Sequence, residues 1–428
     1  MTLRADAPAS KTARALDVGG GILGAGLLVG AAAWVVATCL QQDFAAYYTA
    51  ARARAQGLDP YVNHLTAAGG LWDGIGVYQH SRFLYAPLVA ELFRPLAALP
   101  FPVAKALFTG ASLLALGGAL HMVSRDTRPA PARQGRQRPY LGIMVLVAAV
   151  WPPIFLTLER GQIDLLLLPL LAAAWRWRER PWLGGVCLAR CALAKPPGLA
   201  VLPLLVLAGG RRGALLTVAV IAFVVLFLGA GALVSGPQSS RRYLTEVLPR
   251  AATYGEGGPE AWLLPSDRLT QVAGDLADGT ARIDGRGRAY AQELGTLRRS
   301  ASLARLLSGD DGPSTALSLG IVAALGGVLT TVARRGRDSA GWFWGMLAVG
   351  ILAAPVSWAM SLTCTLPLFF AFPARPTREN RPLSLALVTM FAAGFLGLAM
   401  PVGWALLGLA AVVTAVSFPS PAAHEVPS

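Results

Sequence analysis

Residues 18–40 read VGGGILGAGLLVGAAAWVVATCL, an apolar run without a charged side chain. About 20 such residues cross the hydrocarbon core of a bilayer as an α-helix. A backbone in lipid must satisfy its own hydrogen bonds, so a helix is the structure open to a segment this apolar. We therefore predict a first transmembrane helix over residues 17–40. We expect no cleavable leader, because the run is longer than the apolar part of a signal peptide.

The same composition continues along the chain, which is 54% hydrophobic and 14% charged, with a mean hydropathy of +0.53. Soluble domains carry about 25% charged residues. The sequence thus predicts an all-α polytopic membrane protein with about ten to twelve transmembrane helices. One of these spans is expected over residues 140–158, and residues 83–100 are expected to form an interfacial or re-entrant helix. Prolines should end or kink three later apolar segments, at Lys195-Pro196-Pro197, Pro355 and Pro401.

The net charge of +14 could suggest a nucleic-acid partner, but the basic residues fall in short clusters between apolar segments. That distribution follows the positive-inside rule and argues against nucleic acid. It predicts cytoplasmic termini, a cytoplasmic tail at 1–16, and one transmembrane domain over 17–428 with extracytoplasmic loops at 41–100 and 236–312. An amphipathic helix is expected at 290–307 in the second loop. The Ala, Arg, Gly, Pro and Leu bias indicates a bacterial cell (inner) membrane protein.

The cysteines and histidines show no spacing typical of metal ligands. The four cysteines lie in or beside apolar segments, where small hydrophobic packing is the common role of this side chain. The Asp310-Asp311 pair is typical of a solvated loop end. We therefore predict no cofactor and no required divalent metal.

The polar stretch after the first span, Gln41 to Tyr61, is the strongest candidate for chemistry. Asp43 lies at the exit of the predicted helix, and Tyr47 follows one helical turn later on the same face. A carboxylate at a membrane–water boundary can act as a general base. The alternative is an interfacial helix cap with tyrosines in the aromatic belt, and residue types alone favour this alternative.

Four segments together resemble glycosyltransferase family 87, whose members have the GT-C fold and use polyprenyl-phosphate sugars. The most specific combines an Asp-Phe-x-x-Tyr-Tyr-x-Ala-Ala signature with a following Gly-Leu-Asp-Pro-Tyr. The others resemble the family's Tyr-x-Pro, Gly-Gln-x-Asn and Lys-x-x-Pro segments. In the order given, the four segments are residues 43–51 with 57–61, residues 83–88, residues 160–164 and residues 184–197.

The resemblance implies a membrane glycosyltransferase that moves a mannose-like hexose from a polyprenyl-phosphate donor to a hydroxyl of a lipid or glycan acceptor. Asp43 matches the position of the family's catalytic base. Lys195 is the leading candidate to stabilise the leaving phosphate, since a charge within an apolar segment is costly and usually functional, although snorkelling to an interface is as good an account of it. The other candidate donor- or acceptor-binding residues are Arg160, Gln162, Tyr47, Tyr61 and Tyr85.

The sequence also departs from the family's pattern. Asp164 stands where the family has Asn, and Met360 and Ser361 stand where it has a His pair. These departures keep open an inactive relative that binds lipid-linked glycans. A secondary transporter also stays open, because broken helices would suit one. Transporters usually show paired repeats, however, and the two halves of this sequence show no internal similarity.

Overall fold

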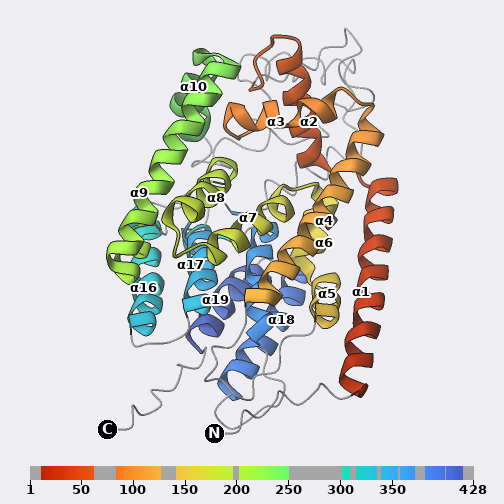
Figure 1. Ribbon diagram of the computed structural model, residues 1–428, viewed down its shortest axis with the longest axis vertical. Helices are drawn as coiled ribbons and strands as arrows, with labels where there is room; N and C mark the ends of the chain where they lie inside the picture. Colours follow the sequence, from red (N-terminus) through yellow and green to blue (C-terminus); the bar gives the residue numbers. More distant parts are fainter. Residues whose placement is uncertain are drawn as a thin grey trace, which may run out of the picture.

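The computed structural model describes residues 11–61, 83–126, 141–195, 202–249, 301–308, 315–334, 339–354, 357–371, 381–400 and 402–417. Nearly all of these residues are helical (Figure 1). Five described helices are long and apolar enough to cross a membrane. They are α1 (Lys11–Thr38), α4 (Phe101–Asp126), α9 (Leu202–Ser235), α16 (Thr315–Arg334) and α18 (Arg381–Ala399).

The protein is an all-α polytopic membrane protein, as predicted, but long helices make up only part of the bundle. Residues 140–158 are not one span, because α5 (Leu141–Ala149) and α6 (Pro152–Arg160) meet at an angle of 62°. Pro152 and Pro153 open α6 and cannot donate backbone hydrogen bonds to the preceding turn. Counting this pair as one span gives six membrane-crossing candidates among the described residues, against the ten to twelve expected.

Shorter helices account for the difference, since each falls below the roughly 20 residues that a straight crossing requires. They are α7 (Asp164–Arg176), α8 (Pro181–Ala194), α17 (Ser339–Ala353), the 3-10 helix η4 (Ala359–Ala371) and α19 (Val402–Val416). The expected proline breaks are confirmed: α8 ends before Lys195, α17 ends at Ala353, and α18 and α19 are separate helices.

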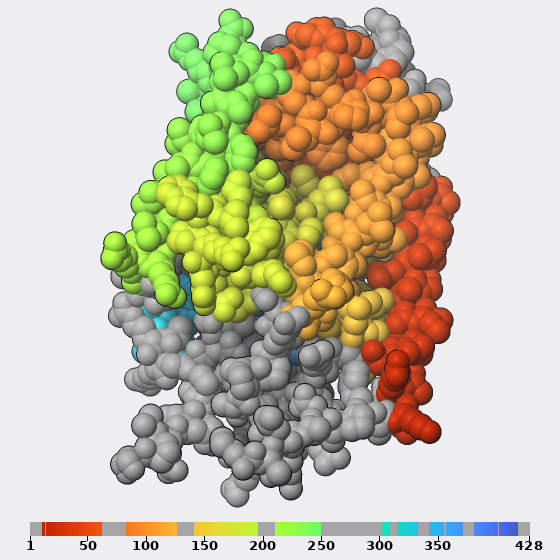
Figure 2. Space-filling model, viewed as in Figure 1, coloured from red at the N-terminus to blue at the C-terminus, as the bar shows by residue number. Residues whose placement is uncertain are grey.

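A second layer lies across one end of the bundle, the upper end in Figure 1. It contains α2 (Gln42–Ala55), α3 (Pro87–Ala97), α10 (Pro237–Arg242) and the π-helical turn η2 (Tyr243–Val247). In Figure 2 the surface formed by α2, α3 and the start of α4 lies beside the surface formed by α9 and α10. The short α15 (Leu303–Ser308) covers the last part of the expected helix at 290–307, and residues 290–300 lie outside the described ranges.

Aromatic side chains fix α2 in this layer. The ring of Phe44 stacks on Phe108 of α4 with centroids 4.6 Å apart, and the ring of Tyr47 lies 4.9 Å from that of Phe93 on α3. Phe44 and Tyr47 have no exposed surface. Each buried aromatic side chain removes a large apolar area from water, so these contacts hold the first turns of α2 firmly against two other helices.

Helices α1 and α5 pack at backbone distance through glycines. A Cβ atom at Gly24 would lie 2.6 Å from the backbone nitrogen of Leu146, and Gly20 stands one turn earlier against Gly142. Small residues spaced by four are the usual means of close helix packing in membranes. The Asp17 carboxylate accepts the backbone N–H of Gly142 at 2.7 Å, which places a negative charge at the amino end of α5.

The glycine contact gives a stability prediction. We expect Gly24→Leu to lower the free energy of unfolding by about 1–3 kcal/mol, as overpacking does. Gly26→Leu is the matched control, since Gly26 is on the same helix and nothing lies within 4 Å of a Cβ atom there. Thermal unfolding of the purified protein, followed by tryptophan fluorescence, makes the comparison. Equal melting temperatures for the two variants would contradict the close packing.

Candidate functional site

The chain turns from α1 into α2 at Gln41, which has left-handed backbone angles (φ 57°, ψ 66°). Glutamine rarely adopts this conformation, and its side-chain amide stabilises it by donating to Thr109 Oγ1 and to the backbone oxygen of Leu158, each at 2.9 Å. The turn puts Asp43 in the first turn of α2, where a carboxylate is favoured by the helix dipole. The Asp43 side chain is buried.

Asp43 meets the turn between α6 and α7. Gln162 Nε2 donates to Asp43 Oδ2 at 2.8 Å, and Arg160 Nε lies 3.8 Å from the same oxygen. Arg160 also donates to the side chain of Gln42. The carboxylate is therefore held by an amide and by a buried guanidinium, both from a segment more than one hundred residues away in sequence.

Gly161 makes this approach possible. Its φ of +67° is in the left-handed region that favours glycine. A Cβ atom there would lie 2.7 Å from Phe44 Cβ and 2.8 Å from Gln41 Cβ. The turn can reach Asp43 only because residue 161 has no side chain.

A chain of hydrogen bonds leads from Asp43 through Gln162 and Tyr47 to Tyr85, and Tyr61 joins it at the backbone of Tyr85. A carboxylate can only accept, so Gln162 presents its amide N–H to Asp43 and its Oε1 to the Tyr47 hydroxyl, 3.3 Å away. The hydroxyls of Tyr47 and Tyr85 are 2.8 Å apart, and the Tyr61 hydroxyl donates to the backbone oxygen of Tyr85 at 2.8 Å. Burial, together with nearby Tyr85 and Asp43, raises the pKa of Tyr47 well above its usual value, so its hydroxyl stays protonated.

Lys195, at the end of α8, lies in a second cluster beside the same turn. Its Nζ donates to Asp164 Oδ2 at 2.7 Å and to Ser361 Oγ of η4 at 3.0 Å. The Asp164 carboxylate opens α7 and Lys195 follows the last turn of α8, so each charge sits at the helix end that favours it. Lys195 therefore points inward to a carboxylate, which argues against snorkelling.

The structure brings the predicted site residues together around one turn. Asp43 and the candidates Arg160, Gln162, Tyr47, Tyr85 and Tyr61 form the first cluster, and Lys195 stands in the second. Sequence reasoning did not assign roles to Asp164 and Ser361. The feature that could have identified them is that both positions depart from the family's motifs. Both residues contact Lys195 in the structure.

The site as a whole combines opposite charges, of which three are buried and that of Lys195 is half-buried. Asp43 and Asp164 are carboxylates, while Arg160 and Lys195 are cations. A carboxylate held in this way can take a proton from a bound hydroxyl. A buried cation can stabilise a negative charge that develops on a bound group.

Comparison with known proteins gives a family and two informative relatives. The profile of Glycosyltransferase family 87 matches residues 83–355, more than half of the chain. A polyprenol-phosphate-mannose-dependent alpha-(1-2)-phosphatidylinositol pentamannoside mannosyltransferase of Mycobacterium tuberculosis is 27% identical over 350 residues, which cover 80% of this chain and 67% of the relative. The protein of the same name from Mycolicibacterium smegmatis is 26% identical over 355 residues, covering 79% and 75%. No solved structure matches.

The Lys195–Asp164 pair generates a prediction about stability. Asp164 is buried and Lys195 is half-buried, so removing one member strands the other charge at a cost of up to about 3 kcal/mol, whereas removing both is far less costly. We therefore expect Lys195→Met and Asp164→Asn each to lower the melting temperature, and the double variant to recover much of the loss. Thermal unfolding of the four proteins forms a double-mutant cycle. Additive losses would show that the two side chains do not stabilise one another.

Proposed function

Because the chain belongs to glycosyltransferase family 87, we propose that this multi-pass membrane glycosyltransferase moves mannose from a polyprenyl-phosphate donor to a hydroxyl of a lipid-anchored acceptor. The names of the two relatives support this donor and suggest a phosphatidylinositol glycolipid as the acceptor. The observation that carries the proposal is the Asp43 carboxylate, held by Gln162 at the end of the first membrane-spanning candidate.

In the proposed reaction, an acceptor hydroxyl oxygen attacks the anomeric carbon of the donor sugar. The bond between that carbon and the phosphate oxygen breaks, and the polyprenyl phosphate leaves with the electron pair. Asp43 takes the proton of the hydroxyl, acting as general base. Its fixed position matters because a positioned base lowers the barrier only when it is within hydrogen-bond reach of the proton.

The leaving phosphate needs a positive partner, and we assign this role to Lys195, assisted by Arg160. The ammonium of Lys195 has three N–H donors. Among the described residues two of them are used, by Asp164 and Ser361, so the third is available to a phosphate oxygen. Arg160 lies beside Asp43 at the end of α6, and Asp164 opens α7 directly after the turn.

The position of the family's His pair still carries a polar contact in this chain. Met360 is fully buried, and the Ser361 hydroxyl accepts a hydrogen bond from Lys195. Ser361 thus orients the ammonium that we assign to the phosphate. This contact supports an active enzyme over an inactive relative that only binds lipid-linked glycans.

The catalytic prediction concerns Asp43. Asp43→Asn keeps the size of the side chain and can still accept from Gln162, but it cannot take a proton at neutral pH. We expect the rate of sugar transfer to fall at least about 100-fold, while binding of the donor lipid is retained. Transfer from a panel of radiolabelled polyprenyl-phosphate sugars measures this, with the exposed Glu246→Gln as the control for loss of a carboxylate.

Two results would contradict the assignment. If Asp43→Asn keeps more than about a tenth of the wild-type rate, Asp43 is not the general base. If the wild type transfers none of the panel's sugars but binds the donors, the chain is a binding relative.

We also propose that the α2–α3 layer faces the outside of a bacterial cell membrane and that the start of α1 faces the cytoplasm. The basic clusters between spans support this orientation. Arg241 and Lys11 are exposed positions in α10 and at the start of α1. In a background with Cys39 and Cys191 changed to Ala, we expect an impermeant thiol reagent to label Arg241→Cys in intact cells, and Lys11→Cys only after permeabilisation. The reverse pattern would invert the topology.

A further inference from the structure

The segment at residues 57–61, directly after α2, belongs to the most specific of the family-like motifs but contributes no group to the proposed reaction. Gly57 ends α2 with a φ of +73°, a left-handed conformation that favours glycine. The backbone N–H groups of Gly57 and Leu58 donate to the carbonyls of Arg54 and Ala53, at 3.1 and 2.8 Å. This pair of bonds is a common way of closing a helix end. The segment therefore leaves α2 from a fixed point.

Asp59 fixes the shape of this segment and ties it to residues 237–247, the arm formed by α10 and η2. Its Oδ1 accepts the backbone N–H of Tyr61 at 2.9 Å, which closes a turn across Pro60. Its Oδ2 forms an ion pair with Arg242, the last residue of α10. Both side chains are 30% exposed, so water screens this pair only in part. Asp59 thus joins two segments that are 183 residues apart in sequence.

The Tyr61 side chain makes a second contact with the arm. Its ring stacks on that of Tyr243 in η2, with centroids 6.3 Å apart and an interplanar angle of 20°. Both rings are buried. π-helical turns such as η2 are rare and frequently occur at functional sites. Because almost no surface of Tyr61 is accessible, this side chain is suited to holding its neighbours and not to touching a sugar.

The hydroxyl of Tyr61 carries this attachment to the candidate site. It donates to the backbone oxygen of Tyr85 at 2.8 Å. Burial is the largest of the effects that raise the pKa of Tyr61 above its usual value, so the hydroxyl keeps its proton. The hydroxyls of Tyr85 and Tyr47 are in contact, and Tyr47 donates to Gln162. Gln162 in turn holds Asp43. The backbone of Tyr85 is therefore where this chain of hydrogen bonds is anchored from outside the site.

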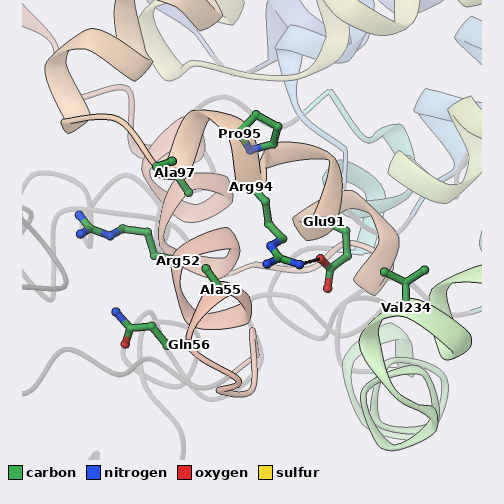
Figure 3. Close-up of a pocket in the computed structure, with 9 residues that line it drawn as sticks. Arg52, Ala55, Gln56, Glu91, Arg94, Pro95, Ala97 and Val234 are labelled. Atoms are coloured by element: carbon green, nitrogen blue, oxygen red, sulfur yellow. Dashed lines mark hydrogen bonds and ion pairs between the residues drawn. The ribbon is translucent and has the colours of Figure 1, made fainter.

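The arm has a support of its own at the end of α9. Figure 3 shows Glu91 of α3 with Arg94 on the same helix and Val234 of α9 nearby. Glu91 Oε1 accepts from Ser235 Oγ and from Arg54 Nε, both at 3.0 Å. The last residue of α9 and the last turn of α2 are thus bound to one carboxylate. Since the arm begins two residues after α9 ends, it too leaves from a fixed point.

We propose that Arg242 and Tyr61 are positioning residues for sugar transfer, which act on the base Asp43 through the chain of hydrogen bonds. This inference rests on the proposed function. The ion pair holds the 57–61 segment on the arm, and Tyr61 holds the backbone of Tyr85. The hydroxyl of Tyr85 then completes the chain that keeps Gln162 turned toward the base. A small displacement of a base lowers the rate steeply, because it must stay within hydrogen-bond reach of the proton.

Tyr61→Phe tests the hydroxyl, because it keeps the ring stack and loses the bond to Tyr85. We expect kcat to fall about tenfold or more. The KM values for donor and acceptor should stay within about twofold of the wild type, since no substrate contact is lost. Tyr48→Phe is the matched control: the buried Tyr48 hydroxyl also donates to a backbone oxygen in the outer layer, that of Leu99, at 2.8 Å. It should lower the melting temperature to a similar extent and keep kcat. Equal falls in kcat, or none with Tyr61→Phe, would overturn the role of this hydroxyl.

Arg242→Gln tests the ion pair. We expect kcat to fall about threefold or more at unchanged KM, and Arg242→Lys, which keeps the charge, to restore most of it. Asp59→Asn keeps the acceptor for the Tyr61 backbone and should match Arg242→Gln, and the double variant should be little worse than either single one. Glu246→Gln removes the other partner of Arg242, at 3.2 Å, and should keep kcat. Losses that multiply in the double variant would show that the two charges do not act together.

Hydrogen exchange tests the same link without any need for activity. The full chain in nanodiscs is followed by mass spectrometry of peptides that cover residues 83–88 and 160–164. We expect Arg242→Gln and Tyr61→Phe to speed exchange in both peptides, because losing an attachment eases local opening, and Glu246→Gln to leave it as in the wild type. Unchanged exchange in the first two variants would show that the arm does not hold the site. A wild type without transfer activity would defeat the proposed function, and exchange alone would then decide whether the link exists.

Discussion

The site depends on one close backbone approach, between the Arg160–Gln162 turn and the first turn of α2. Gly161 faces Phe44 and Gln41 at a distance that admits no Cβ atom. The contact is enforced from both sides: Gln41 is held in a left-handed turn by Thr109 and Leu158, and Phe44 is stacked on Phe108. Because packed interiors do not deform continuously, this approach fixes Gln162 on Asp43 without needing a ligand.

Several features of the fold were accessible from sequence because they follow from local physics. Apolar length predicts spans and proline predicts breaks, which is why the first span and the ends of α8, α17 and α18 were located. The 62° bend between α5 and α6 was not predicted. Pro152 and Pro153 lie in a run that is apolar throughout, and hydropathy does not separate a straight helix from a bent one.

The sequence names candidate site residues but does not give their geometry. Asp43, Gln162 and Lys195 were singled out from motifs, yet the motifs could not say which of them touch. The Asp164–Lys195–Ser361 contacts join three segments far apart in the chain, and only tertiary packing brings them together. Asp164 and Ser361, the two partners of Lys195, both stand where the sequence departs from a family motif. In space they form one cluster.

That cluster explains how the protein tolerates a lysine in an apolar setting. A lone charge there would cost about 2.5–3.5 kcal/mol on insertion scales, and Asp164 offsets it in the absence of ligand. If Lys195 holds the leaving phosphate, as we propose, the same contact constrains the donor. A phosphate that approaches Lys195 also approaches Asp164, so binding must gain more from the ammonium and Arg160 than it loses to the carboxylate. A neutral donor would gain nothing from displacing or sharing that ion pair. The arrangement therefore favours a donor that keeps its negative charge, as a lipid phosphate does. After the sugar has left, the carboxylate beside the ammonium disfavours retention of the phosphate.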